Sequence, residues 1–161
     1  MNARDIELRI VKYFNPRVNV IVPNVYWGFG LNYEMDMAVI TKARYLYEIE
    51  IKVTAADIKA DLKKRNQHSS KLAKLLYFAV PEELQDNPHI PARAGIISIG
   101  KYTGVTKCPE TNKSARKLND KEYMEIMRLG CMRIWTLKER LKDRENYIKI
   151  LRSPGPEKEE R

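Results

Sequence analysis

The chain has few cysteines and no long apolar segment, and each scarcity excludes a class of protein. Its 161 residues include two cysteines, Cys108 and Cys131, without Cys-x-x-Cys spacing, so neither a zinc site nor a disulfide framework is indicated. No apolar run approaches membrane-spanning length, and the first residues, MNARDIELR, lack the apolar core of a signal peptide. We therefore expect a cytoplasmic protein without a membrane partner.

Positive charge is what the composition has in excess. The 30 Lys and Arg residues outnumber the 21 Asp and Glu residues, which gives a formal net charge of +9. Such a balance favours a polyanionic partner, with nucleic acid ahead of an acidic membrane, although small basic proteins are common. Length and hydrophobic content predict one domain over residues 1–151, and residues 152–161 have the composition of a disordered tail.

Two neighbouring segments, Tyr33–Ile40 and Tyr45–Val53, alternate apolar and polar residues with the period of half-buried strands. Their polar face is unusual because it carries carboxylates and an ammonium group instead of hydroxyl groups. These charged residues are Glu34, Asp36, Glu48, Glu50 and Lys52. The two segments form a candidate site if these side chains reach the same face of a sheet.

The connection between the two strands decides that question. If Lys42–Arg44 forms a three-residue loop, the antiparallel register places Asp36 opposite Glu50 and Glu34 opposite Lys52. A one-residue slip would instead put the two sets of acids on opposite faces. We predict the first arrangement, and two facing carboxylates then require a cation between them.

A first helix is predicted over Asn2–Phe14, with Asn2 as its N-cap. On a helical wheel Glu7 falls within the apolar arc that also contains Ile6 and Ile10. An acid in that position is expected to be paired, protonated or bound to a metal ion. The alternative is that Glu7 lies at the edge of the apolar face and extends to water.

After the second acidic strand, Thr54 and Asp57 form a capping box that starts a helix running to about Arg65. Basic residues follow on this helix and beyond it: Lys59, Lys63, Lys64, Arg65 and Lys71. They make either an ordinary solvated face or, beside an acidic metal pocket, a rim that binds phosphates. His68, in the polar stretch NQHSS, is a secondary candidate, although a lone His in such a segment is more often incidental than catalytic.

The other strands are predicted from short apolar runs. They are expected at residues 18–22, 75–80 and 94–99, and the last two are apolar on both faces, which is typical of strands at the centre of a sheet. Residues 24–31 contain glycine and three aromatic side chains, and we expect an aromatic plug over the core in preference to a platform for stacking bases. Residues 101–119 are expected to form a long polar connector.

A last helix is predicted to start at a cap formed by Asn119 and Glu122 and to continue to about residue 151. Large side chains recur along it at helical spacing: Met124, Met127, Cys131, Ile134, Trp135 and Leu141. We expect this stripe to pack in the core. The Met-rich helix is also compatible with a homodimer.

The expected fold is therefore α/β, a central mixed β-sheet flanked by helices. Glu50-Ile51-Lys52 is the only Glu-x-Lys in the chain and ends the third strand, Asp36 precedes it by the length of a hairpin, and Glu7 is on the first helix. This arrangement resembles the PD-(D/E)XK nuclease superfamily, whose restriction-endonuclease-like core has the order αβββαβ. EIEIKVTAADIKADLKK followed by LLYFAVPEEL is most similar to small MmcB-type DNA-repair nucleases and their phage relatives.

The resemblance covers about residues 1–100 and leaves 101–151 as a C-terminal extension. It implies a Mg²⁺- or Mn²⁺-dependent deoxyribonuclease of a bacterial or phage-infected cell, acting in DNA repair, recombination or phage DNA processing. The metal ion would be held by Asp36, Glu50 and the backbone carbonyl of Ile51. Lys52 would orient or activate the attacking water and stabilise negative charge, and Glu7 would act through a water or orient a ligand.

The chain departs from the family pattern in one place, because no Pro-Asp dipeptide precedes the site. Glu34 and Glu48 share the polar face, and either is a candidate to replace Glu7 at the metal ion or to pair with Lys52. Three interpretations follow: a DNA endonuclease, a nucleic-acid-binding module that keeps the fold without the chemistry, and a structural protein whose acids line a solvated sheet edge. The sequence does not separate DNA from RNA as the partner.

Overall fold

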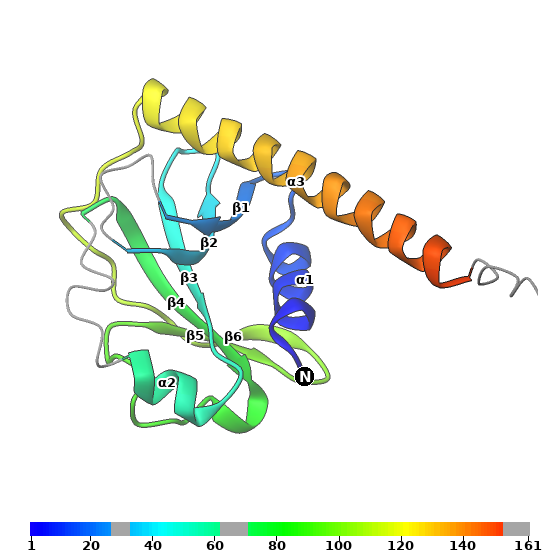
Figure 1. Ribbon diagram of the computed structural model, residues 1–161. Coiled ribbons are helices and arrows are strands. Elements are labelled where there is room, and N and C mark those ends of the chain that lie inside the picture. The colour runs from blue at the N-terminus through cyan, green and yellow to red at the C-terminus, as the bar shows by residue number, and fades with distance from the viewer. Residues whose placement is uncertain (27–32, 62–70, 153–161) are drawn as a thin grey trace, which may run out of the picture.

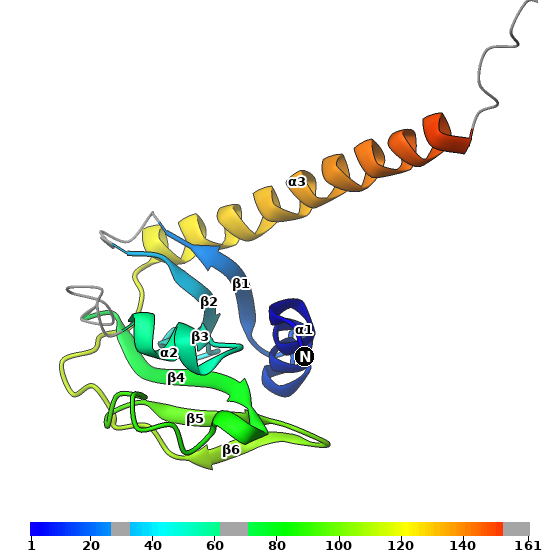
Figure 2. The same ribbon diagram turned by 60° about the horizontal axis from the view of Figure 1, so that its bottom comes forward.

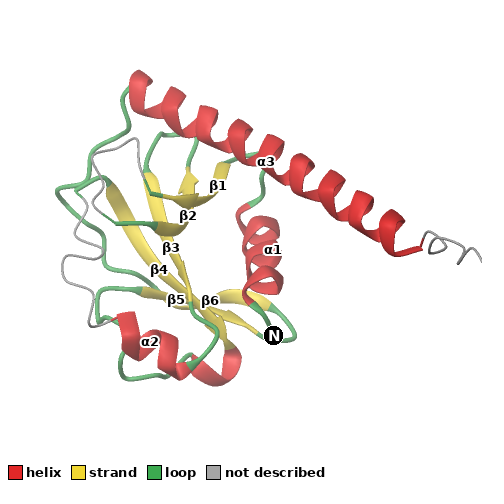
Figure 3. Ribbon diagram, viewed as in Figure 1, coloured by secondary structure: helices red, strands yellow, loops and turns green. Residues whose placement is uncertain are grey.

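The computed structural model describes residues 1–26, 33–61 and 71–152, and it contains a six-stranded mixed β-sheet flanked by helices (Figures 1 and 3). The strands follow one another across the sheet in chain order: β1 (Val20–Val25), β2 (Met35–Ile40), β3 (Leu46–Ile51), β4 (Ala73–Pro81), β5 (Gly95–Ile99) and β6 (Thr103–Lys107). The β3–β4 and β4–β5 pairs are parallel and the other three pairs are antiparallel. The predicted α/β class is confirmed.

Helices cover both faces of this sheet. They are α1 (Ala3–Phe14), α2 (Ala55–Asp61), the short 3-10 turn η1 (Glu82–Leu84) and α3 (Asp120–Arg152). Helix α2 forms the crossover that parallel pairing of β3 and β4 requires. Within the described ranges, no helix combines the length and apolar character that a membrane crossing needs.

Two of the sequence predictions need correction at the sheet edges. Strand β6 lies inside the stretch expected to be a polar connector, because an edge strand with an exposed side tolerates polar residues such as Thr103 and Lys107. Strand β1 extends past Pro23, which was expected to end it. Proline is accepted there because β1 is also an edge strand and needs no N–H on its open side.

Helix α1 starts as predicted at Asn2, whose side chain accepts a hydrogen bond from the Asp5 N–H at 2.9 Å, while the Asp5 carboxylate accepts one from the Asn2 N–H at 3.1 Å. Its buried residues Ile6 and Ile10 pack against odd-numbered strand residues, among them Met37 and Ile49. Helix α1 therefore covers the sheet face formed by the odd-numbered side chains of β2 and β3.

The opposite face is covered by α2 and by the first half of α3. Ile58 of α2 packs with Leu76 and Phe78, and Ile126 of α3 packs with Ala38. These contacts involve the even-numbered residues of β2 and β4. The even-numbered acids identified in the sequence consequently lie on the α2 and α3 side of the sheet.

The hairpin between β2 and β3 has the predicted register. Its paired residues run from Ile40 with Leu46 to Met37 with Ile49, and the Thr41 N–H donates to the Tyr45 carbonyl at 3.0 Å. Arg44 has a φ of 64°, the left-handed conformation that closes a common type of three-residue hairpin loop. The loop thus sets the register that places the acids of both strands on one face.

Helix α3 begins as predicted and buries different side chains from those expected. The stripe from Met124 to Leu141 is exposed, with Trp135 at 63% and Ile134 at 56%, while the buried residues are Ile126 and Leu129. The expectation of core packing is therefore wrong. Only the first half of α3 lies on the sheet, and the second half extends beyond it, as both views show (Figures 1 and 2).

The N-terminus of α3 provides a test of local stability. The Asn119 side chain accepts a hydrogen bond from the Glu122 N–H at 2.9 Å, and the Glu122 carboxylate accepts one from the Asn119 N–H at 2.9 Å. We expect Asn119→Ala to lower the free energy of unfolding by about 1 kcal/mol in urea denaturation. Asn146→Ala is the control, because Asn146 is exposed inside the same helix and Ala favours helix. Equal losses in the two variants would contradict the capping role.

Candidate active site around Lys52

The central residue of the candidate site is Lys52, which directly follows β3. Its N–H donates to the Ala79 carbonyl of β4 at 3.1 Å, so the backbone is held where the parallel pair ends. The chain then turns into α2 at the predicted capping box of Thr54 and Asp57, whose two side-chain to backbone hydrogen bonds measure 3.1 and 3.2 Å. The side chain of Lys52, 8% exposed, lies in the angle between sheet and helix.

Three carboxylates from three elements surround the Lys52 ammonium. Nζ lies 2.8 Å from Oε2 of Glu50 in β3, 3.1 Å from Oδ1 of Asp61 in α2, and 3.7 Å from Oδ2 of Asp36 in β2. Glu50 and Asp61 are almost fully buried, with side chains 2% and 5% exposed. One cation therefore connects two strands and a helix on the α2 side of the sheet.

The charge of Lys52 is stabilised by these neighbours. Burial by itself lowers the pKa of the ammonium, but the charge and hydrogen bond of Glu50, together with Asp36 and Asp61, outweigh burial and hold the pKa above the usual lysine value. Lys52 is therefore a cation at neutral pH. In this arrangement it can donate hydrogen bonds and stabilise negative charge, but it does not take a proton from water.

Asp36 is the most solvent-accessible of the three acids, at 39% exposure. Its Oδ2 accepts a hydrogen bond from the Ile51 N–H at 2.8 Å, next to the last paired residues of the β2–β3 ladder, Met37 and Ile49. The side chain thus takes the place of a backbone acceptor and is fixed against β3. One carboxylate of the cluster is in this way both positioned and open to solvent.

Glu7 lies near this exposed side of the cluster. It is half-buried on α1, and the pKa of its carboxyl is raised by burial, lowered by Arg4 and raised again by Asp36. Helix α1 packs on the face opposite to Lys52, and the recorded link between Glu7 and the cluster is the effect of the Asp36 charge on its pKa. Glu7 is therefore neither fully buried in the apolar face nor fully solvated. It is a partly buried acid whose pKa is affected by the charge of Asp36.

The remaining predicted residues are separate from the Lys52 cluster or fall outside the described residues. Glu48 is fully buried and accepts a hydrogen bond from the Tyr33 hydroxyl at 2.9 Å, and Glu34 is exposed. The ion pairs recorded for Lys52 within the described part of the chain are formed by Glu50, Asp61 and Asp36, and neither Glu34 nor Glu48 is among them. Lys59 is exposed on α2, whereas Lys71 is exposed just before β4, at the opposite end of that strand from Lys52. The candidates outside the described residues are Lys63, Lys64, Arg65 and His68.

Asp61 is the functional candidate that sequence reasoning missed. Its signal was present, because Asp61 follows Ile58 by three residues and therefore shares the buried face of α2. An acid on the buried face of a helix beside a buried lysine indicates a partner for that lysine. That Asp61 pairs with Lys52 depends on how α2 packs on the sheet, with Ile58 against Phe78, and this packing cannot be predicted from the local sequence.

The chemistry of the oxygen donors suits a hard cation. Among the residues that the structure describes, no group of three or more His, Cys, Asp or Glu side chains is arranged to hold a metal ion. Mg²⁺ in phosphate-processing sites, however, is commonly bound through one or two carboxylates with water and substrate phosphate completing its shell. Asp36 and Glu50, which both direct an oxygen at Lys52 Nζ, provide two such carboxylates without nitrogen or sulfur ligands.

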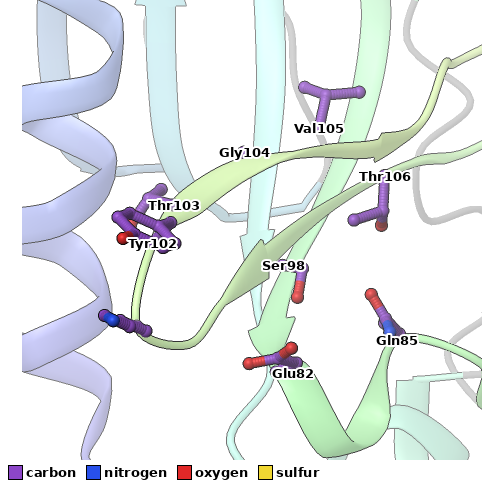
Figure 4. A pocket seen from close by; sticks show the side chains of 9 residues that line it. Glu82, Gln85, Ser98, Tyr102, Thr103, Gly104, Val105 and Thr106 are labelled. Atoms are coloured by element: carbon purple, nitrogen blue, oxygen red, sulfur yellow. The ribbon is translucent and has the colours of Figure 1, made fainter.

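A separate pocket of about 540 Å³ lies beside the β5–β6 hairpin (Figure 4). Glu82, Gln85 and Ser98 line one part of it, and Tyr102 lies near the turn of the hairpin. None of the residues of the Lys52 cluster lines this pocket. The pocket and the Lys52 cluster are therefore separate sites, and the acids predicted from the sequence to form a site, Asp36 and Glu50, belong to the Lys52 cluster.

Comparison with known proteins supports the fold. No family model matches the chain, and no curated protein matches it. Among solved structures, the chain is similar to the SPO1766 protein of unknown function from Silicibacter pomeroyi, with a TM-score of 0.65 and 16% sequence identity. The match covers 90% of this chain and 94% of that chain. At this identity the similarity shows a shared fold over nearly the whole length.

The ion cluster predicts strong coupling between Lys52 and Glu50. Lys52→Met leaves buried carboxylates without their central cation, and we expect it to lower the free energy of unfolding by about 3–5 kcal/mol. Adding Glu50→Gln removes one of those charges, so the double variant should be more stable than the sum of the two single effects by about 1 kcal/mol or more. Urea denaturation of the four proteins measures this difference.

The matched control for that cycle is Lys12→Met, because Lys12 is exposed on α1. This substitution should change the unfolding free energy by no more than about 0.5 kcal/mol. Strictly additive effects of Lys52→Met and Glu50→Gln would contradict the ion cluster.

Proposed function

We propose that the chain is a Mg²⁺- or Mn²⁺-dependent nuclease of the PD-(D/E)XK type that hydrolyses phosphodiester bonds in DNA. The observation that carries the proposal is that a carboxylate oxygen of Asp36 and one of Glu50 both lie within 4 Å of Lys52 Nζ at the end of β3. The order α1-β1-β2-β3-α2-β4 supports it, because it corresponds to the αβββαβ core of that superfamily. The net charge of +9 fits a polyanionic substrate.

The metal ion would be held by the carboxylates of Asp36 and Glu50, with the Ile51 carbonyl as a third ligand by resemblance to the superfamily. When bound, such an ion lowers the pKa of a water ligand and neutralises charge on the phosphate. Asp36 suits this role because it is partly exposed, and because the Ile51 N–H fixes Oδ2, the same oxygen that lies 3.7 Å from Lys52 Nζ.

The side chains themselves supply charge and position. Lys52 keeps its proton at neutral pH and would stabilise negative charge that develops on the phosphate. Asp61 holds the Lys52 ammonium from the α2 side at 3.1 Å and acts as a positioning residue. Glu7, whose pKa is raised by burial and by Asp36, would orient a water at the edge of the site. Lys59, exposed on α2, would bind a flanking phosphate.

One observation favours a second function, a nucleic-acid-binding module without cleavage. The carboxylate of Glu50 is engaged by Lys52 at 2.8 Å, so an incoming metal ion competes with a tightly held ammonium for the same oxygen. If the Lys52 ammonium stays bound to Glu50 and keeps the metal ion out, the protein would bind nucleic acid and leave it intact. Cleavage measurements separate the two functions.

The test is cleavage of single-stranded, duplex and branched DNA with Mg²⁺, with Mn²⁺ and with EDTA. We expect metal-dependent cutting by the wild type and a loss of about 100-fold or more in Asp36→Asn and Lys52→Met, because each removes a group that stabilises charge at the reacting phosphate. Circular dichroism verifies that each variant is folded. Glu139→Gln is the control for charge removal, since Glu139 is exposed on the second half of α3, which extends beyond the sheet, and its activity should equal that of the wild type.

Salt-sensitive DNA binding by a wild-type protein that does not cut with either metal ion would favour the binding module. Absence of both cutting and binding would contradict both functions. The same assay with RNA identifies the nucleic acid.

A further inference from the structure

The second half of α3 carries an apolar surface that no part of its own sheet covers. The helix leaves the sheet after its first half and projects away from the body of the molecule (Figures 1 and 2). Ile134, Leu137 and Leu141 are 56%, 53% and 49% exposed on this projection. Side chains of this size are uncommon on a solvated helix when they occur together, and they indicate a contact surface.

These residues follow the spacing of a coiled-coil seam. Ile134, Leu141 and Ile148 are seven residues apart, and Leu137 lies three residues after Ile134. Ile134, Leu141 and Ile148 take one core position of successive heptads, and Leu137 takes the other. In the next heptad that second position is held by Arg144 in place of an apolar residue. The seam therefore forms a narrow stripe along the projecting helix, suited to one other helix.

We propose that this stripe pairs with the same stripe of a second copy of the chain, with the two helices antiparallel. In this arrangement Leu137 packs against the partner's Ile148, and Leu141 packs beside the partner's Arg144. Because the pair is related by a two-fold axis, each of these contacts forms twice. The arrangement is independent of the proposed nuclease function.

Charge complementarity selects the antiparallel direction. In the stated register, Lys138 faces the partner's Glu145, and Arg140 faces the partner's Tyr147, so that an ion pair and a cation–π contact each form twice. A parallel pair would also form one ion pair twice, between Arg140 and the partner's Glu145, but it would place the cation of Arg133 opposite that of the partner's Lys138. The antiparallel pair has no such repulsion. The antiparallel pair also separates the two sheets, because each sheet lies at the N-terminal half of its own α3 (Figure 2).

Arg144 makes this pair weak and gives the sharpest test. Its charged group lies in the seam opposite the partner's Leu141, where an apolar side chain would be buried on association. We expect a monomer–dimer equilibrium that depends on concentration, and we expect Arg144→Leu to tighten it by about tenfold or more. Leu141→Glu should leave only monomer.

The experiment is sedimentation velocity of the full chain over a wide range of concentrations, under reducing conditions because Cys131 is exposed on the same helix. Met132→Glu is the matched control. Met132 is 47% exposed on α3, but it lies on the side opposite to the seam, so its substitution should leave association unchanged. Equal loss of association in Met132→Glu and Leu141→Glu would overturn the assigned seam.

The direction of pairing is tested by charge. Lys138→Glu should weaken an antiparallel dimer by facing the partner's Glu145, whereas it would strengthen a parallel one by facing the partner's Arg133. The double variant Lys138→Glu with Glu145→Lys should restore the antiparallel dimer. A monomer at every concentration in both wild type and Arg144→Leu would overturn the proposal.

Discussion

The rest of the candidate site depends on the burial of the Lys52 ammonium among carboxylates. A buried lysine is costly unless opposite charges offset the loss of water. Here the charges come from Asp36 in β2, Glu50 in β3 and Asp61 in α2, so the ammonium is stable only when these three elements are in place. The same contacts that build a chemically useful cluster therefore tie the crossover helix to the sheet.

The location of the cluster follows from the sheet topology. The β2–β3 hairpin brings the start of β2 beside the end of β3, and the parallel β3–β4 pair places α2 over that end. Acids at the start of β2 and at the end of β3 consequently share one face. In α/β proteins the carboxyl ends of parallel strands are where ligands commonly bind, and the solvent-exposed Asp36 lies at this edge.

Local patterns predicted much of this arrangement. The alternation of Tyr33–Ile40 and Tyr45–Val53 and the three-residue loop between them predicted the strands, their register and their common acidic face. The capping boxes of all three helices could likewise be predicted, because each depends on residues three positions apart. What could not be predicted depends on how distant elements dock. Asp61 faces Lys52 only because Ile58 packs on the sheet, and Met124 and Trp135 are exposed because α3 packs through the other side of the helix, at Ile126 and Leu129.

The central claim is that Lys52 is a cation held by buried carboxylates, and the most direct measurement is its own titration. The side-chain Cε resonance of Lys52, assigned by NMR and followed with increasing pH, reports when the ammonium loses its proton. Because the folded-state pKa is raised, the account predicts that Lys52 stays protonated as the pH passes the ordinary lysine value of about 10.4. Loss of the proton at or below that value would contradict the account.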